Sequence, residues 1–101
     1  MKPISSYPKQ EHQPGFVVWE LDHQDGQRRL EFFCEACGYN HFFDERWMWN
    51  GDYVKPTFYP SLLVNGHTPS MKCHSFVTDG EIHYLADCFH GFKNQRIPLK
   101  P

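Results

Sequence analysis

Two cysteines separated by two residues are the strongest chemical signal in this sequence: Cys34 and Cys37, followed directly by Gly38. A CxxC turn can place two thiolates on one metal ion, and the glycine permits the tight backbone of a zinc knuckle. A redox pair is the alternative, but redox CxxC motifs usually open a helix within a βαβ unit. Strand-like segments flank this motif on both sides, which favours a metal site.

A hairpin in the second half of the chain supplies the remaining candidate ligands. The Asp-Gly pair at 79–80 predicts a two-residue turn, which pairs Cys73 with Ala86. Cys73 and Cys88 then become diagonal neighbours on one face, roughly 7 Å apart between backbones. The same register turns His74 to the opposite face and argues against it as a ligand. Five candidates for four zinc positions result: Cys34, Cys37, Cys73, Cys88 and His90.

Either choice of fourth ligand gives a closed Zn²⁺ site with four cysteines, or with three cysteines and one histidine, as in structural zinc sites. His41 could also ligate, but we expect it to border the site. If only three candidates bind, an open position would allow hydrolysis, with Asp52 or Asp87 as the base. If none binds, Cys73 and Cys88 are buried free thiols.

The segment 47–62 combines aromatic residues, prolines and polar turn residues. Trp47 and Trp49 are expected to share a strand face and pack together. One interpretation is a core strand followed by a rigid loop, in which Asn50 and Asp52 cap the turn backbone. The other is a ligand or peptide groove with aromatic walls. The groove would use seven residues: Trp47, Trp49, Asn50, Asp52, Lys55, Thr57 and Ser61.

The elements that would position these residues are mostly strands. Residues 16–21 and 29–33 indicate two strands joined by a turn at 22–27, and 41–49 indicates a third. Two prolines confine residues 55–64 to a sheet edge or an irregular loop. No stretch has a long 3.6-residue apolar period. The sequence therefore predicts a small, mainly β domain of antiparallel hairpins with a zinc knuckle and little helix.

Length and composition limit the remaining choices. A chain of 101 residues holds one domain. We expect a zinc-stabilised β domain over 15–101, preceded by an extended arm, or a frayed tail, over 1–14. The net charge of −2 does not favour nucleic-acid binding. No apolar segment is long enough to span a membrane, and no secretory signal is visible, so we expect a reducing bacterial cytoplasm.

The chain contains three longer motifs: CxxCG at 34–38, WxWNGDxxKPTFxPSLLV at 47–64, and CHSFVTDGxIxYLxDCxH at 73–90. Together they resemble those of a family of small phage and prophage proteins of unknown function, whose members are often labelled ammonia monooxygenase. The resemblance implies a zinc-binding protein. It favours His90 over Cys88 as fourth ligand, because the position of Cys88 can hold serine in that family. The ligands it implies are Cys34, Cys37, Cys73 and His90.

Together these observations predict a phage-type accessory or host-interaction module, non-enzymatic, with structural zinc and a host or phage protein as partner. A homodimer is left open. The alternative is a zinc-dependent hydrolase, or a protein that binds a small molecule or nucleotide through the aromatic loop 47–62.

Overall fold

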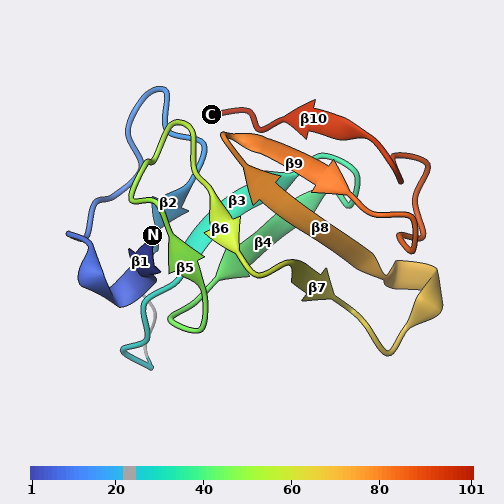
Figure 1. Ribbon diagram of the computed structural model, residues 1–101, viewed down its shortest axis with the longest axis horizontal. Coiled ribbons are helices and arrows are strands. Elements are labelled where there is room, and N and C mark those ends of the chain that lie inside the picture. Colours follow the sequence, from blue (N-terminus) through green and yellow to red (C-terminus); the bar gives the residue numbers. More distant parts are fainter. Residues whose placement is uncertain (22–24) are drawn as a thin grey trace.

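The computed structural model describes residues 1–21 and 25–101, and within these ranges the chain forms ten strands in three antiparallel sheets (Figure 1). The first sheet has the order β2-β3-β4 and comprises β2 (Trp19–Glu20), β3 (Leu30–Cys34) and β4 (Tyr39–Phe43). The second has the order β1-β5-β6 and comprises β1 (Lys2–Pro3), β5 (Met48–Trp49) and β6 (Phe58–Tyr59). The third has the order β10-β9-β8-β7 and comprises β7 (Leu62–Val64), β8 (Cys73–Thr78), β9 (Glu81–Tyr84) and β10 (Arg96–Pro98).

The helical content is limited to two 3₁₀ turns in the described residues, η1 (Ile4–Ser6) and η2 (Pro69–Met71). No described helix has the length and apolar character needed to cross a bilayer. The predicted class, a small mainly β domain of antiparallel hairpins, is confirmed.

The hairpin at 79–80 forms as predicted. Both turn residues have positive φ, 51° at Asp79 and 78° at Gly80, as a two-residue turn with the strand twist requires. Val77 pairs with Ile82, but β9 ends at Tyr84, so the predicted Cys73–Ala86 pair is absent from the ladder. The chain turns after Tyr84 instead, and this turn carries part of the site described below. Of the turn predicted at 22–27, residues 22–24 lie outside the described residues.

The single strand predicted over 41–49 is wrong, because the chain turns in its middle. Asp44 causes the break: its carboxylate accepts the Arg46 backbone N–H at 3.0 Å, and its carbonyl accepts that of Trp47 at 3.1 Å. The two tryptophans therefore do not pack together as predicted. The Trp47 ring lies under the Arg46 guanidinium, whereas Trp49 is fully buried in the core.

Aromatic rings fill the space where the sheets meet. Phe43 of β4 stacks on Phe58 of β6 with ring centroids 3.8 Å apart, and Phe58 lies parallel to Trp49 of β5 at 6.0 Å. All three side chains are buried. Stacked rings gain dispersion energy beyond their area burial, so the rings join the first two sheets into one core.

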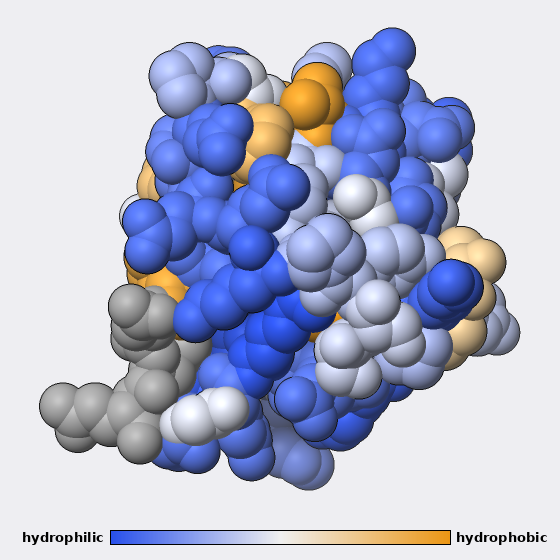
Figure 2. Space-filling model, turned by 90° about the vertical axis from the view of Figure 1, so that its left-hand side faces the viewer, coloured by the Kyte–Doolittle hydropathy of each residue, from blue (hydrophilic) through white to orange (hydrophobic). Residues whose placement is uncertain are grey.

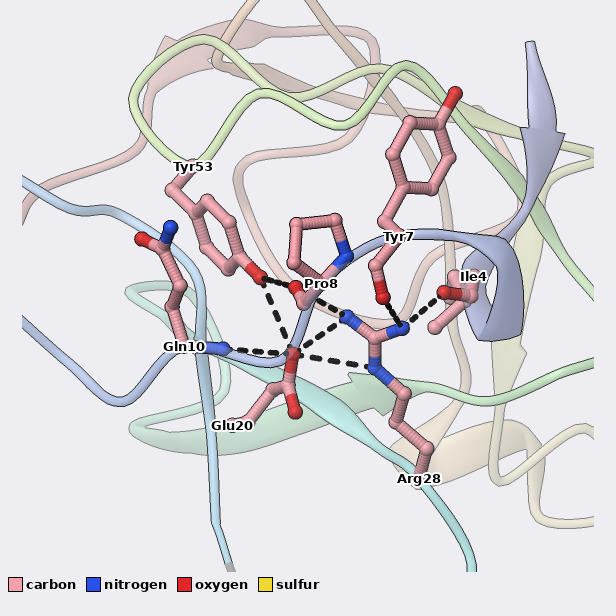
Figure 3. Close-up of polar contacts among 7 residues, drawn as sticks. All are labelled: Ile4, Tyr7, Pro8, Gln10, Glu20, Arg28 and Tyr53. Atoms are coloured by element: carbon pink, nitrogen blue, oxygen red, sulfur yellow. Dashed lines mark hydrogen bonds and ion pairs between the residues drawn. The ribbon is translucent and has the colours of Figure 1, made fainter.

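A buried ion pair holds the first residues of the chain against the domain (Figure 3). Arg28 Nη2 lies 2.6 Å from Glu20 Oε1, and the Tyr53 hydroxyl donates to the same oxygen at 3.1 Å. Burial and the neighbouring Glu20 carboxylate raise the pKa of Tyr53 to about 12. The Arg28 guanidinium also donates to three carbonyls of the N-terminal segment, those of Ile4, Tyr7 and Pro8.

This N-terminal side of the molecule is largely hydrophilic. Figure 2 shows it covered by polar and charged residues, with the apolar ones in small separate patches. The cysteine, histidine, serine and aspartate side chains that could carry chemistry lie instead on β3, β4 and β8, in the turn that joins β3 to β4, directly before β7, and in the turn after β9.

Candidate functional site

Strand β8 supplies side chains to two sites on its opposite faces. Successive residues of a strand point to opposite sides of the sheet. Cys73 is 1% exposed and faces the interior, whereas the next residue, His74, is half-buried and faces outward. The register Leu63↔His74 places Leu63 of β7 on that outer face as well. The sequence argument that His74 faces away from the cysteines is therefore correct.

The inner site is a cluster of thiols and imidazoles. Their ligand atoms all lie within 4.8 Å of one another in two overlapping groups that share Cys73. A tight turn bounded by a bond from Gly38 N to Cys34 O (2.8 Å) joins β3 to β4 and carries the CxxC pair. The first group is Cys34, Cys37, His41 and Cys73. The second is Cys73, Cys88 and His90.

The thiols of the first group compete for protons. A hydrogen bond with Cys73 is the main cause that lowers the pKa of Cys34 to about 3, and the Tyr84 hydroxyl lies 3.1 Å from the same sulfur. Burial and the nearby Cys34 raise the pKa of Cys37 to about 11, and the bond to Cys34 raises that of Cys73. The negative charge of one thiolate thus disfavours deprotonation of the neighbouring thiols. A divalent cation would remove this repulsion, so the group has the chemistry of a metal site.

Two histidines compete for the fourth position. His41 is 2% exposed, and its Nε2 has no hydrogen-bond partner among the described residues. The same ring contributes to the lowered pKa of Cys34, and one of its nitrogens lies within 4.8 Å of the three sulfurs. In His90 the Nδ1 atom accepts the Phe92 backbone N–H at 3.3 Å, which requires the proton of a neutral ring to sit on Nε2. That Nε2 lies 3.5 Å from Cys73 Sγ and donates to it. The set Cys34, Cys37, His41 and Cys73 therefore fits a metal better than one completed by His90.

The outer site is a chain of hydrogen bonds between a serine, a histidine and an aspartate. Ser61 Oγ lies 3.0 Å from His74 Nε2. On the other side of the ring, His74 Nδ1 lies 3.2 Å and 3.1 Å from the two carboxylate oxygens of Asp87. Lys72 Nζ reaches the same carboxylate at 3.0 Å and is the main cause that holds the pKa of Asp87 below its usual value.

The proton positions in this array follow from its chemistry. An ionised carboxylate only accepts hydrogen bonds, so His74 Nδ1 must carry the proton that lies between the ring and Asp87. In the neutral ring, Nε2 is then an acceptor facing the Ser61 hydroxyl. This is the tautomer in which a histidine can remove the proton of a serine nucleophile, with the aspartate holding the ring in place.

Three separate elements bring this array together. Ser61 directly precedes β7, and its carbonyl accepts the Trp47 indole N–H at 3.3 Å. His74 lies within β8, and Asp87 lies in the turn after β9, closed by a bond from Cys88 N to Leu85 O at 3.3 Å. The positions of Ser61, His74 and Asp87 thus depend on the third sheet.

A cavity of about 340 Å³ lies along the chain immediately after Ser61. Four consecutive residues of β4 line it, together with the three residues of β7 and the residue that follows them. Consecutive residues of a strand point to alternate faces, so a cavity on one face would contact only every second residue. This cavity contacts every residue in both segments and therefore follows the edges of the two strands. Its walls are Tyr39, Asn40, His41, Phe42, Arg46, Trp47, Leu62, Leu63, Val64 and Asn65.

The seven residues predicted to form a groove are dispersed. Trp49 is fully buried, and the side chains of Asn50 and Asp52 bond the backbone of their own loop, from 2.8 to 3.2 Å. Thr57 Oγ1 accepts the Asp79 N–H at 2.9 Å, and the Lys55 carbonyl accepts the Asn50 amide. Of the seven, Trp47 lines the cavity and Ser61 belongs to the outer array.

From the sequence, Ser61 was predicted only as a groove residue and Asp87 only as a base beside a zinc ion, and His74 was discounted as a ligand. The hairpin register alone could not join them, because it turned His74 away from the cysteines without including the strand that follows Ser61. Only the pairing of β7 with β8, in which Leu63 lies opposite His74, brings Ser61 to this face.

Comparison with known proteins identifies a family. Residues 4–85 match the model of a family described as "Bacterial ubiquitination-like system serine protease (BubE)". The matched range contains Ser61 and His74 and ends two residues before Asp87. No curated protein and no solved structure shows significant similarity.

This match corrects the functional prediction. A non-enzymatic phage accessory or host-interaction module is wrong, because the matched family is described as a serine protease of a bacterial system. The description favours neither the zinc-dependent hydrolase nor the small-molecule or nucleotide-binding protein offered as the alternative. Because the match covers most of the residues of this chain, the chain belongs to the BubE family of bacterial ubiquitination-like system serine proteases.

Proposed function

We propose that this chain is a serine protease in which Ser61 is the nucleophile, His74 the general base and Asp87 the residue that orients His74. The observation that carries the proposal is the continuous array from Ser61 Oγ through the His74 ring to the Asp87 carboxylate, with bonds of 3.0 to 3.2 Å. These lengths are within the range expected of a serine activated by an adjacent base. The family description independently names this class of enzyme.

The reaction would proceed in two steps. In the first, Ser61 Oγ attacks the carbonyl carbon of the substrate while His74 Nε2 takes the hydroxyl proton, then gives it to the leaving amine as the C–N bond breaks. In the second, a water attacks the resulting ester with His74 again as base, which releases the acid and restores Ser61. Asp87 stays ionised throughout and stabilises the imidazolium.

The substrate would be a polypeptide. The cavity along β4 and β7 follows two strand edges beside Ser61, and strand edges present backbone N–H and C=O groups that can pair with an extended chain. The family description names a bacterial ubiquitination-like system, which supports a protein of such a system as the substrate.

The inner cluster would hold a structural Zn²⁺ through Cys34, Cys37, Cys73 and His41. Four nitrogen and sulfur ligands from two sheets make a closed site, the kind that stabilises a fold rather than activates water. The unpartnered Nε2 of His41 and the mutual repulsion of the thiols support this assignment. Zinc would join the β3–β4 turn to β8 one residue before His74.

The proposal is tested by ester hydrolysis. p-Nitrophenyl acetate reports the formation of an acyl-enzyme as a burst of p-nitrophenol, without the need to know the natural substrate. Ser61→Ala is compared with Ser70→Ala, which removes an exposed hydroxyl from η2. We expect the burst in the parent protein and in Ser70→Ala, and none in Ser61→Ala. An equal burst in Ser61→Ala would assign the reaction to another nucleophile and refute the proposal.

A further inference from the structure

Cys88 is the one cysteine that the proposed zinc site does not use. It directly follows Asp87 in the sequence. Cys88 is buried at 6% exposure, and its sulfur is close enough to Cys73 and His90 to count among candidate metal ligands. Its hydrogen bonds, however, are made with the backbone of a different residue, His74.

The Cys88 thiol binds both polar groups of that backbone. The His74 N–H donates to Cys88 Sγ at 3.3 Å, and the S–H donates to the His74 carbonyl at 3.1 Å. The same carbonyl also accepts the Leu85 N–H at 2.9 Å, so both of its lone pairs are used. The Cys88 side chain thus completes the backbone hydrogen bonds of His74 on the edge of β8 that β9, which ends at Tyr84, no longer covers.

These contacts distinguish a sulfur that bonds to the backbone from one that binds a metal. A sulfur bound to a metal is deprotonated, and it could still accept the His74 N–H. It could not donate to a carbonyl, and a thiolate 3.1 Å from the His74 oxygen would set two acceptors against each other. The contact of Cys88 Sγ with the His74 carbonyl is thus a bond that a thiol can make and a metal-bound sulfur cannot.

The position of this thiol connects it to the outer site. Cys88 follows Asp87 in the chain, and its sulfur bonds to the backbone of His74. His74 is the residue whose ring Asp87 orients. Two backbone bonds flank the contact, from Leu85 N to His74 O at 2.9 Å and from Phe89 N to Lys72 O at 2.9 Å. They tie the turn to β8 on either side of Asp87, and the thiol supplies the bond between them.

We propose that Cys88 is a positioning residue of the protease, whose thiol bridges the N–H and C=O of His74 and so holds Asp87 in register with the imidazole. This rests on the proposed function of Ser61, His74 and Asp87. It assigns Cys88 to the reacting array and removes it from the metal site, although it lies beside the metal ligands.

The test compares Cys88→Ala, which removes the bridge, with Cys88→Ser, which keeps a donor and an acceptor in the same place. Active sites are counted by the p-nitrophenol burst, so that unfolded protein does not enter kcat, and zinc per chain is measured by native mass spectrometry. We expect Cys88→Ala to lower kcat between about 10- and 100-fold with little change in KM, since small misplacement of a base is costly. Cys88→Ser should recover much of this loss, and both variants should retain one zinc.

A second measurement, by NMR, does not depend on turnover. The proton between His74 Nδ1 and Asp87 gives a downfield NMR resonance when the bond is formed, and it is observed in the folded molecules only. We expect this resonance in the parent protein and Cys88→Ser, and its weakening in Cys88→Ala.

Three results would overturn the assignment of Cys88. They are an unchanged kcat with an unchanged His74 resonance in Cys88→Ala, equal losses in the alanine and serine variants, and loss of zinc from Cys88→Ala. Each leaves the proposed protease intact if Ser61→Ala still abolishes the burst. If Ser61→Ala keeps the burst, the protease proposal itself fails, and the role of Cys88 fails with it.

Discussion

The inner cluster and the outer array are built from neighbouring residues, yet their surroundings differ in almost every respect. Cys73 is 1% exposed among other thiols, whereas His74 is half-buried and bonds to Asp87, which is exposed. The inner groups compete for protons, as the opposite pKa shifts of Cys34 and Cys37 show. In the outer array each group donates to the next. Strand alternation alone separates the two environments.

The difference shows how so small a chain can support a reacting group. A domain of this size has a modest core and little rigidity to spare. The inner side of β8 would be fixed by metal, through Cys73, so that the outer side can expose His74 to solvent and substrate. The two sites should therefore respond differently to substitution: changes at the inner site should affect stability, and changes at the outer site should affect activity.

The largest effect is expected at the inner site. Cys73→Ser removes a ligand shared by β8 and the CxxC turn, so the variant should lose zinc and unfold. Structural zinc sites supply on the order of 10 kcal/mol, which matches the whole stability of a typical domain. Thermal melting and native mass spectrometry check this. Wild-type melting with zinc still bound would contradict the structural role of the cluster.

At the outer site we expect a large loss of activity without loss of fold. His74→Ala removes the base from the array, and loss of one member of such a triad lowers kcat on the order of 10⁴-fold or more. Because the ring is half-buried and its partners are polar, the melting temperature should change little. Kinetics and calorimetry on the same sample test both statements. A His74→Ala variant that loses zinc would show that the two sites are not separate.

The choice between the histidines sharpens the inner site. His41→Ala should lower zinc affinity strongly, because its ring is buried beside the three thiols and its Nε2 has no hydrogen-bond partner among the residues that the structure describes. His90→Ala should keep zinc, since His90 Nδ1 is already bonded to the Phe92 N–H. Competition with a chromophoric chelator measures both affinities. The reverse order would assign the fourth position to His90, as the family resemblance implied.

The smallest effect is expected at Lys72. Its ammonium lies 3.0 Å from Asp87 Oδ2, but the pair is exposed to solvent, where ion pairs are screened and contribute little. Lys72→Met should lower kcat only a few-fold, and less at high salt. A salt titration of kcat in both proteins checks this. A loss as large as that of His74→Ala would mean that Lys72 takes part in the reaction itself.

The sequence predicted the inner cluster better than the outer array, for a physical reason. A CxxC turn is a local motif, so Cys34 and Cys37 could be recognised without knowledge of the fold. The hairpin at 79–80 was also local, and it placed Cys73 correctly on the inner face. Ser61 and Asp87, by contrast, are common residue types that meet His74 only after three elements assemble.

The errors in the predicted fold also come from tertiary or polar effects that periodicity does not record. The apolar run 41–49 looks continuous, but Asp44 bonds the following backbone and turns the chain. The hairpin register was extended past Tyr84 to Ala86, although the turn that carries Asp87 begins there. Both departures are needed to form the sites: the first places Trp47 against the Ser61 carbonyl, and the second places Asp87 against His74.

Covalent labelling with a fluorophosphonate tests the central claim most directly. This reagent phosphonylates serines that are activated by a neighbouring base, and peptide mass spectrometry locates the adduct. We predict one adduct per folded chain on Ser61, absent from Ser61→Ala and strongly slowed in His74→Ala. An adduct on a different residue, or a folded and zinc-loaded protein that remains unlabelled, would contradict the account of this chain as a serine protease.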